Sequence, residues 1–155
     1  MQTFLPFQSY RASAQCLDHR RLGKQRVETW QIYRALIGET KGWVNHPATK
    51  MWRGFEWQLL QYGILCCDAW IERGYSDTLR EKMMEAQATH LYCEVPWWVN
   101  ETELCLSHRS NLMRKHREHY IVYFDVSTPD DLPYIWPSKL PEFAEKSMAK
   151  LFPKE

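Results

Sequence analysis

The sequence lacks most features that mark secreted, membrane-spanning or metal-binding proteins. Its 155 residues include only five cysteines, an odd number with no Cys-x-x-Cys pair, so we expect reduced thiols and no disulfide framework or zinc site. No stretch approaches the roughly 20 consecutive apolar residues that a membrane-spanning helix requires. The opening residues lack the basic and apolar regions of a signal peptide, and we therefore expect a cytoplasmic protein.

Internal repeats, low-complexity tracts and linkers are also missing. We therefore expect one domain over residues 1–155, a length that is sufficient to bury a hydrophobic core. The alternation of apolar and polar residues that is typical of strands does not occur, which favours an all-α fold. Apolar residues make up 45% of the chain and aromatic residues 14%, too many for a disordered protein.

Apolar periodicity and turn residues predict where the helices lie. We expect helices over residues 13–37, 51–73, 77–91 and 101–123, and a loop over residues 39–50. In the second of these helices the apolar residues recur at alternating steps of four and three, which is typical of a helix packed in a core. The predicted architecture is a compact single-domain helical bundle.

A proline-rich strap is expected to follow the bundle. The prolines in this part of the chain are Pro129, Pro133, Pro137 and Pro141. Because proline interrupts helices, this segment is predicted to be irregular and to lie on the domain, with Tyr134 and Trp136 as anchors. A short helix over residues 142–151 is expected to close the chain.

The charges are unevenly distributed although the formal net charge is only +1. Between Arg11 and Arg53 there are nine lysines and arginines and three acidic residues. A second basic cluster contains Arg109, Arg114, Lys115 and Arg117. Two basic clusters in a nearly neutral protein are consistent with one positive face that binds nucleic acid, and equally with two ordinary solvated helix faces.

The first basic cluster contains a stripe that suggests catalytic chemistry. Arg21, Lys24 and Glu28 are spaced i, i+3 and i+7, so a helix places them on one face. A carboxylate surrounded by cations suits a site for a phosphate-bearing ligand, although a surface ladder of ion pairs has the same spacing. Gly23, inside the same helix, indicates close approach either of a ligand or of another helix.

Further residues are candidates for contacts with DNA. His46, Lys50 and Arg53 lie near the start of a helix, where phosphate binds readily, and a capping loop without a ligand is the alternative. Arg114, Lys115 and Arg117 are candidates for binding the backbone from the other side, with a solvated basic turn as the alternative, and Arg109 is a further candidate for a DNA contact. Tyr120 is a candidate for stacking on an unpaired base, or else a core residue.

Several of these segments resemble one family of enzymes. The opening residues, residues 17–29, the Asn-His-Pro segment at 45–47 and the run at 108–115 resemble the pyrimidine-dimer DNA glycosylases of the phage endonuclease V type. They are more similar still to bacterial and phage relatives of those enzymes. The resemblance covers most of the chain to about residue 123. It implies a compact all-α domain that binds and bends duplex DNA.

The resemblance also implies roles for individual residues. The family cleaves the glycosidic bond with an N-terminal α-amine and a helix-borne glutamate, which corresponds to Glu28, with Arg21 and Lys24 beside it. Arg20 and Arg26 correspond to basic side chains that hold phosphates. The family has a histidine seven residues before its glutamate, and this chain has Arg21 there, which is a departure from the pattern.

The nucleophile has three alternatives. The family uses the amine that is exposed when the initiator methionine is removed, but the second residue here is Gln2, whose large side chain normally blocks that removal. The nucleophile is therefore the amine of Met1, the amine of Gln2, or a water molecule assisted by Glu28. An α-amine has a pKa near 7.7–8.0, so more of it than of a lysine is free base at neutral pH.

The sequence thus predicts a monomeric DNA glycosylase that excises a damaged or bulky modified pyrimidine from double-stranded DNA without a metal or other cofactor. AP-lyase activity accompanies excision if an amine is the nucleophile. Two alternatives remain open. One is an anti-phage defence glycosylase that acts on hypermodified phage bases, and the other is a DNA-binding module without catalytic activity.

Overall fold

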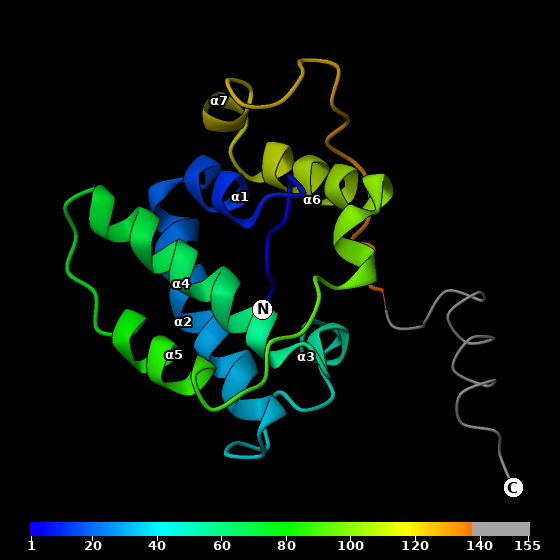
Figure 1. Ribbon diagram of the computed structural model, residues 1–155. Helices are drawn as coiled ribbons and strands as arrows, with labels where there is room; N and C mark the ends of the chain where they lie inside the picture. Colours follow the sequence, from blue (N-terminus) through cyan, green and yellow to red (C-terminus); the bar gives the residue numbers. More distant parts are fainter. Residues whose placement is uncertain (138–155) are drawn as a thin grey trace, which may run out of the picture.

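The computed structural model describes residues 1–137, and this part of the chain is all-α, as predicted (Figure 1). It contains seven α-helices and one 3-10 helix, and no strand occurs among the described residues. The elements are α1 (Tyr10–Cys16), α2 (His19–Leu36), α3 (Pro47–Trp52), α4 (Glu56–Glu72), α5 (Arg80–Gln87), η1 (Trp97–Asn100), α6 (Thr102–Lys115) and α7 (Arg117–Tyr120). None of the helices in residues 1–137 is long and apolar enough to cross a membrane.

Two long helices, α2 and α4, form the centre of the molecule. They pack closely because α4 has a glycine at the contact: a Cβ built on Gly63 would lie 2.7 Å from the Thr29 methyl group of α2 and 2.6 Å from the sulfur of Met83 in α5. A Cβ built on Gly23 of α2 would likewise lie 3.1 Å from the Trp70 ring of α4. Helix packing therefore accounts for Gly23, and a ligand is not needed to explain it.

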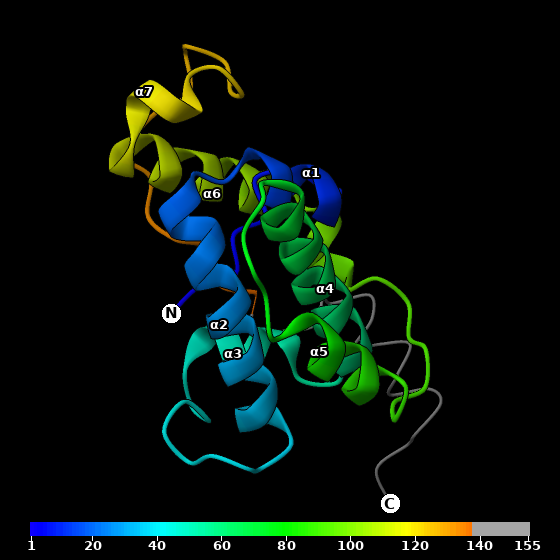
Figure 2. The same cartoon turned by 90° about the vertical axis from the view of Figure 1, so that its left-hand side faces the viewer.

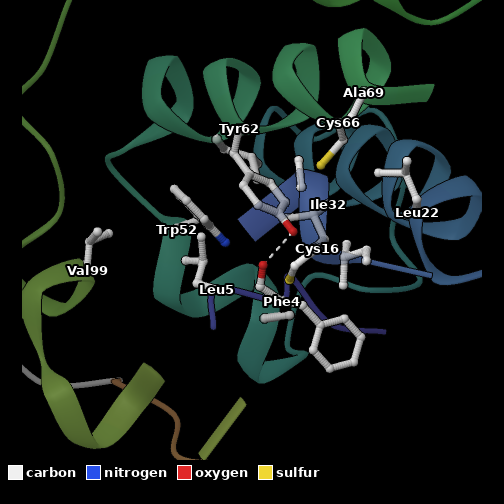
Figure 3. Packing of buried hydrophobic residues seen from close by; sticks show 14 of the residues in the cluster. Phe4, Leu5, Cys16, Leu22, Ile32, Trp52, Tyr62, Cys66, Ala69 and Val99 are labelled. Carbon is white, nitrogen blue, oxygen red and sulfur yellow. Dashed lines mark hydrogen bonds between the residues drawn. The ribbon is translucent and has the colours of Figure 1, made fainter. Parts of the chain in front are cut away.

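The N-terminal segment, residues 1–6, precedes the first helix and is largely buried in the core. Thr3 and Leu5 have no exposed surface and Phe4 is 6% exposed, which is unusual for the start of a chain. The Tyr62 hydroxyl of α4 donates to the Phe4 carbonyl at 2.8 Å, as the dashed line in Figure 3 shows. Figure 2 shows the start of the chain beside α2.

The helix predicted over residues 13–37 is in fact two helices. Leu17 and Asp18 adopt extended backbone conformations between α1 and α2. The Asp18 carboxylate accepts hydrogen bonds from the Arg21 guanidinium, at 3.0 Å, and from the Tyr120 hydroxyl of α7. Tyr120 lies about a hundred residues further along the chain, so local sequence patterns do not predict this contact.

Other boundaries differ from prediction for local reasons. The helix expected over residues 51–73 is interrupted at Gly54, where φ is +87°, so that α3 and α4 are separate. The expected loop over residues 39–50 ends earlier, because α3 begins at Pro47. The helix expected over residues 101–123 breaks at His116, which has an extended φ of −157°. The third predicted helix is shorter than expected, and Asp77 caps it by accepting from the Leu79 and Arg80 amides.

Helices α1, α6 and α7 gather at one end of the molecule in both views (Figures 1 and 2). The described part of the strap, residues 129–137, has no regular secondary structure and is tied to α6. The hydroxyl of Ser107 donates to the Pro133 carbonyl at 2.7 Å and accepts from the Ile135 amide at 3.0 Å. Tyr134 and Trp136 pack against the core. The helix expected over residues 142–151 lies outside the described residues.

Candidate active site

A cavity of about 300 Å³ lies between the N-terminal segment and α2. This volume is at the lower end of the range for pockets that bind small molecules, roughly 300–1,000 Å³. The residues that line it are Met1, Gln2, Phe4, Arg20, Arg21, Lys24, Gln25, Glu28, Lys115 and Tyr134. The five predicted catalytic residues therefore line one cavity, together with two of the predicted DNA contacts, Arg20 and Lys115.

Helical spacing explains why α2 supplies half of the lining. Its residues in the cavity occupy one face over three successive turns and end at Glu28, while Leu22 and Ile32 on the other side of the helix are fully buried. This amphipathic arrangement fixes the orientation of the polar face, because rotating the helix would expose its apolar side chains. The predicted stripe is therefore a wall of a cavity.

The carboxylate of Glu28 lies against the start of the chain. Its Oε2 atom accepts from the backbone N–H of Gln2 at 3.3 Å and from the side-chain amide of Gln25 at 3.3 Å. Its Oε1 atom is 4.0 Å from the Lys24 ammonium group, whose side chain is 68% exposed. These contacts are long, and the side chain of Glu28 is 19% exposed, so the carboxylate faces the cavity without a tightly bound partner.

Arg21 does not pair with Glu28. Its guanidinium is 3.0 Å from the carboxylate of Asp18. Burial alone would raise the pKa of the Asp18 carboxyl, but hydrogen bonds from Tyr120 and Arg21 outweigh burial and hold this pKa below its usual value. Arg21 is thus a fixed cation at the edge of the cavity, oriented by a buried carboxylate.

The cavity carries an excess of positive charge. Four cationic side chains line it, those of Arg20, Arg21, Lys24 and Lys115, whereas Glu28 is the single carboxylate among the lining residues. Within residues 1–137 there is no cluster of three side chains that could hold a metal ion. Such an arrangement suits a polyanionic ligand that brings phosphate groups close to one carboxylate.

The charges of this site influence the pKa of His46, although this residue does not line the cavity. Burial lowers the pKa of its imidazole, and the positive N-terminal amine lowers it further, whereas Glu28 raises it. Its Nδ1 atom accepts from the Ala48 amide at 3.0 Å and so caps α3. His46 therefore caps the start of α3, which is the alternative to a phosphate contact that the sequence left open. Lys50 and Arg53 are exposed nearby and also lie outside the cavity lining.

Two predicted DNA contacts lie in the interior instead. Arg26 projects from another face of α2, where its guanidinium is 2.6 Å from Asp77 and 4.7 Å from the centre of the Trp70 ring. Only 11% of its side chain is exposed, because Trp70 of α4 and Asp77 of the turn before α5 lie against it. Tyr120 has no exposed surface and binds Asp18. Neither side chain is free to contact DNA, which corrects both predictions.

The two arginines of α6 make hydrogen bonds within the protein. Arg109 donates to the Pro6 carbonyl at 2.7 Å and lies over the Phe7 ring. Arg114 donates to the side chain of Asn111 and, at 3.1 Å, to the Asp130 carbonyl. Both therefore fix neighbouring segments, and of the second basic cluster only Lys115 reaches the cavity.

Three lining residues were not predicted from the sequence. Phe4 and Tyr134 form an aromatic wall, with ring centres 6.4 Å apart and planes tilted by 50°. They come from opposite ends of the chain, and no local pattern relates them. The position of Gln25 in the lining was predictable, because it lies three residues before Glu28 and therefore on the same helical face.

Comparison with known proteins identifies one family. No curated protein and no solved structure matches the chain, but the model of one family, described as pyrimidine dimer DNA glycosylase, matches residues 1–83. The matched segment contains eight of the ten residues that line the cavity, including Glu28. Because the match spans 83 of the 155 residues, the chain belongs to the pyrimidine dimer DNA glycosylase family.

Proposed function

We propose that this protein excises a pyrimidine dimer, or another damaged pyrimidine, from double-stranded DNA, with Glu28 as the catalytic carboxylate. One observation carries the proposal: the Glu28 carboxylate is 3.3 Å from the backbone nitrogen of Gln2 in a cationic cavity. A carboxylate and the start of the chain are the two groups that the family's chemistry requires, and the fold brings them together.

The cations of the cavity would hold the DNA backbone. Arg20, Lys24 and Lys115 are exposed at the cavity and can contact phosphates without reading the base sequence. The ring of Tyr134, which is half-buried beside Phe4, offers a surface on which a planar base can rest. Moving a nucleotide out of the stack costs a few kcal/mol, and less when the base is already damaged, which favours lesions over intact DNA.

Glu28 would act on the sugar to which the damaged base is attached. As the glycosidic C–N bond breaks, the bonding electron pair leaves with the base and positive charge develops on the sugar. A carboxylate held beside that sugar stabilises this charge. The long contacts of Glu28 with its present partners leave it able to approach the substrate.

We further propose that an α-amine is the nucleophile. Met1 and Gln2 both line the cavity, which supports an amine nucleophile on either residue. The amine nitrogen would bond to C1′ as the base departs, and Glu28 would take up the amine proton. Opening of the sugar ring then gives a Schiff base, from which β-elimination cleaves the strand, with Glu28 again assisting proton transfer.

A panel of duplexes tests the proposed function. Purified protein is incubated with duplexes that contain a pyrimidine dimer, a bulky modified pyrimidine or no damage, and strand breaks are measured with and without alkali. We expect direct breaks in the dimer-containing duplex and a covalent protein–DNA adduct on reduction with borohydride. Breaks that appear only after alkali would contradict the amine nucleophile, and the modified duplex as sole substrate would support the defence function.

The same panel separates an enzyme from a simple DNA-binding module. A protein that binds all of the duplexes but alters none of them would contradict the proposed activity. The mass of the intact protein, measured before and after borohydride reduction, identifies whether Met1 or Gln2 carries the amine.

A further inference from the structure

Gln25 is a buried polar residue that the proposed chemistry does not use. It belongs to α2, one turn before Glu28, and only 1% of its surface is exposed. A primary amide is costly to bury unless its donors and acceptors are satisfied, so its partners show what it does in the fold. The amide reaches both the N-terminal segment and the carboxylate of Glu28.

Every hydrogen-bonding position of the Gln25 amide faces a polar group within hydrogen-bonding distance. Its Oε1 atom accepts from the Phe4 amide at 2.6 Å and lies 2.6 Å from the Tyr62 hydroxyl, whose single proton is shared between Oε1 and the Phe4 carbonyl. Its Nε2 atom donates to the Gln2 carbonyl at 2.5 Å and to Glu28 Oε2 at 3.3 Å. Exchanging the oxygen and nitrogen would place donors against the Phe4 N–H and an acceptor against a carboxylate, so these partners fix the orientation.

The Gln25 amide makes the two hydrogen bonds that a neighbouring β-strand would make with this segment. The Gln2 carbonyl and the Phe4 N–H flank Thr3 and point to the same side, which is the pair of groups that an adjacent strand would bind. Two further hydrogen bonds hold the segment. Trp52 donates to Thr3 Oγ1 at 2.9 Å, and His108 accepts from the Leu5 amide at 2.8 Å. The segment therefore has one defined register.

We propose that Gln25 is a positioning residue that couples the N-terminal segment to Glu28. A single rigid amide sets the distance between the main chain that carries the amine and the carboxylate that assists it. This inference rests on the proposed function. Because a misplacement of about 1 Å at a reacting group can slow catalysis by roughly 100-fold, losing this amide should affect the chemical step.

The first test compares Gln25→Met with Gln58→Met. Methionine has a similar volume but cannot replace the hydrogen bonds. Gln58 is a matched control because it is 3% exposed, donates to the Cys93 carbonyl at 2.7 Å and does not line the cavity. We expect Gln25→Met to lower the single-turnover rate on dimer-containing DNA about 100-fold. DNA affinity should stay within about threefold, since a side chain that is 1% exposed offers little contact surface.

The second test uses Gln25→Glu, which keeps the shape of the side chain and both acceptor positions. When ionised, the introduced carboxyl repels the Gln2 carbonyl and Glu28, and when protonated it regains one donor. The rate of this variant, divided by the wild-type rate at the same pH, should therefore rise as the pH is lowered from about 8 to about 6. A purely structural defect would leave this ratio constant.

Hydrogen exchange at the Phe4 amide gives a readout that does not depend on activity. Exchange should be faster in Gln25→Met than in the wild-type protein and unchanged in Gln58→Met. Equal rates of catalysis in the two methionine variants, a parallel loss of DNA affinity, or unchanged Phe4 exchange would each overturn the positioning role. A wild-type protein that keeps Phe4 protected and still alters no duplex would refute the proposed function instead.

Discussion

Glu28 and Asp18 are both carboxylates of the α2 region, and their surroundings give them different roles. Asp18 is 7% exposed and is held by Arg21 and Tyr120, which lower the pKa of its carboxyl despite the burial. Its partners make it a structural anchor. Glu28 is more accessible and has only long contacts, so a substrate can take their place.

His108 is a buried base whose protonation should destabilise the fold. Burial lowers the pKa of its imidazole to about 3, and its Nδ1 atom accepts from the Leu5 amide. In the unfolded chain the pKa returns to about 6.5, so between these values the unfolded state binds more protons. The free energy of unfolding should therefore decrease as the pH falls from about 6.5 towards 4.

Urea unfolding of the wild-type protein and of His108→Gln at several pH values in this window measures the effect. We expect a weaker pH dependence in the variant, because the glutamine amide can accept from Leu5 without titrating. Asp18 and Asp77, whose carboxyl pKa values are both lowered, should contribute only below this window. Equal slopes for the two proteins would show that His108 is not the titrating group.

At the scale of helices, the crossing of α2 and α4 depends on Gly63. A Cβ at this position would lie 2.7 Å from the stiff side chain of Thr29, so one of the helices must shift to accept it. Overpacking costs about 1–3 kcal/mol, which exceeds or offsets the roughly 1 kcal/mol that alanine gains over glycine within a helix. We expect Gly63→Ala to lower the free energy of unfolding by up to about 2 kcal/mol.

Gly42→Ala is the control for this substitution, since nothing lies within 4 Å of a Cβ at Gly42. Urea midpoints of the two variants should differ, with Gly42→Ala close to the wild-type protein. If Gly63→Ala were as stable as Gly42→Ala, close helix contact would not be the reason for the glycine.

The elements also show what the sequence could and could not predict. The polar stripe of α2 was predictable because helical spacing alone sets which residues share a face. The break at Asp18 was not predicted, and its contact with Tyr120, a residue of a distant helix, leaves no local pattern in the sequence. Helical spacing predicts only the α2 side of the cavity, and the resemblance to a known family adds Met1 and Gln2. Phe4 and Tyr134 reach it through tertiary packing, and Gln25 acts through contacts that a spacing rule does not reveal.

At the scale of the whole molecule, the family match and the fold have different extents. The match ends at residue 83, but buried groups before that point bind partners after it. Leu5 donates to His108, Asp18 binds Tyr120, and Arg109 holds the Pro6 carbonyl. Lys115 and Tyr134 complete the lining of the cavity. The matched segment therefore carries most of the site but not all of the contacts that hold it together.

These contacts predict that the fragment of residues 1–83 does not fold by itself. Removing the later helices would leave the Leu5 N–H without a partner and would take the Tyr120 hydroxyl away from the Asp18 carboxylate, and unpaired buried polar groups are costly. Circular dichroism during urea unfolding should show one cooperative transition for the full chain and none for the fragment. A cooperative transition in the fragment would mean that the second half is a separate unit.

The central claim is that Glu28 performs the chemistry in the cationic cavity. Its most direct test is the single-turnover rate of base excision from dimer-containing DNA by Glu28→Gln, with Glu39→Gln as control because Glu39 is an exposed partner of Arg34 at 2.9 Å. We predict a fall of at least about 100-fold for Glu28→Gln, with DNA binding retained and the control unaffected. Excision by Glu28→Gln at the wild-type rate would contradict the account.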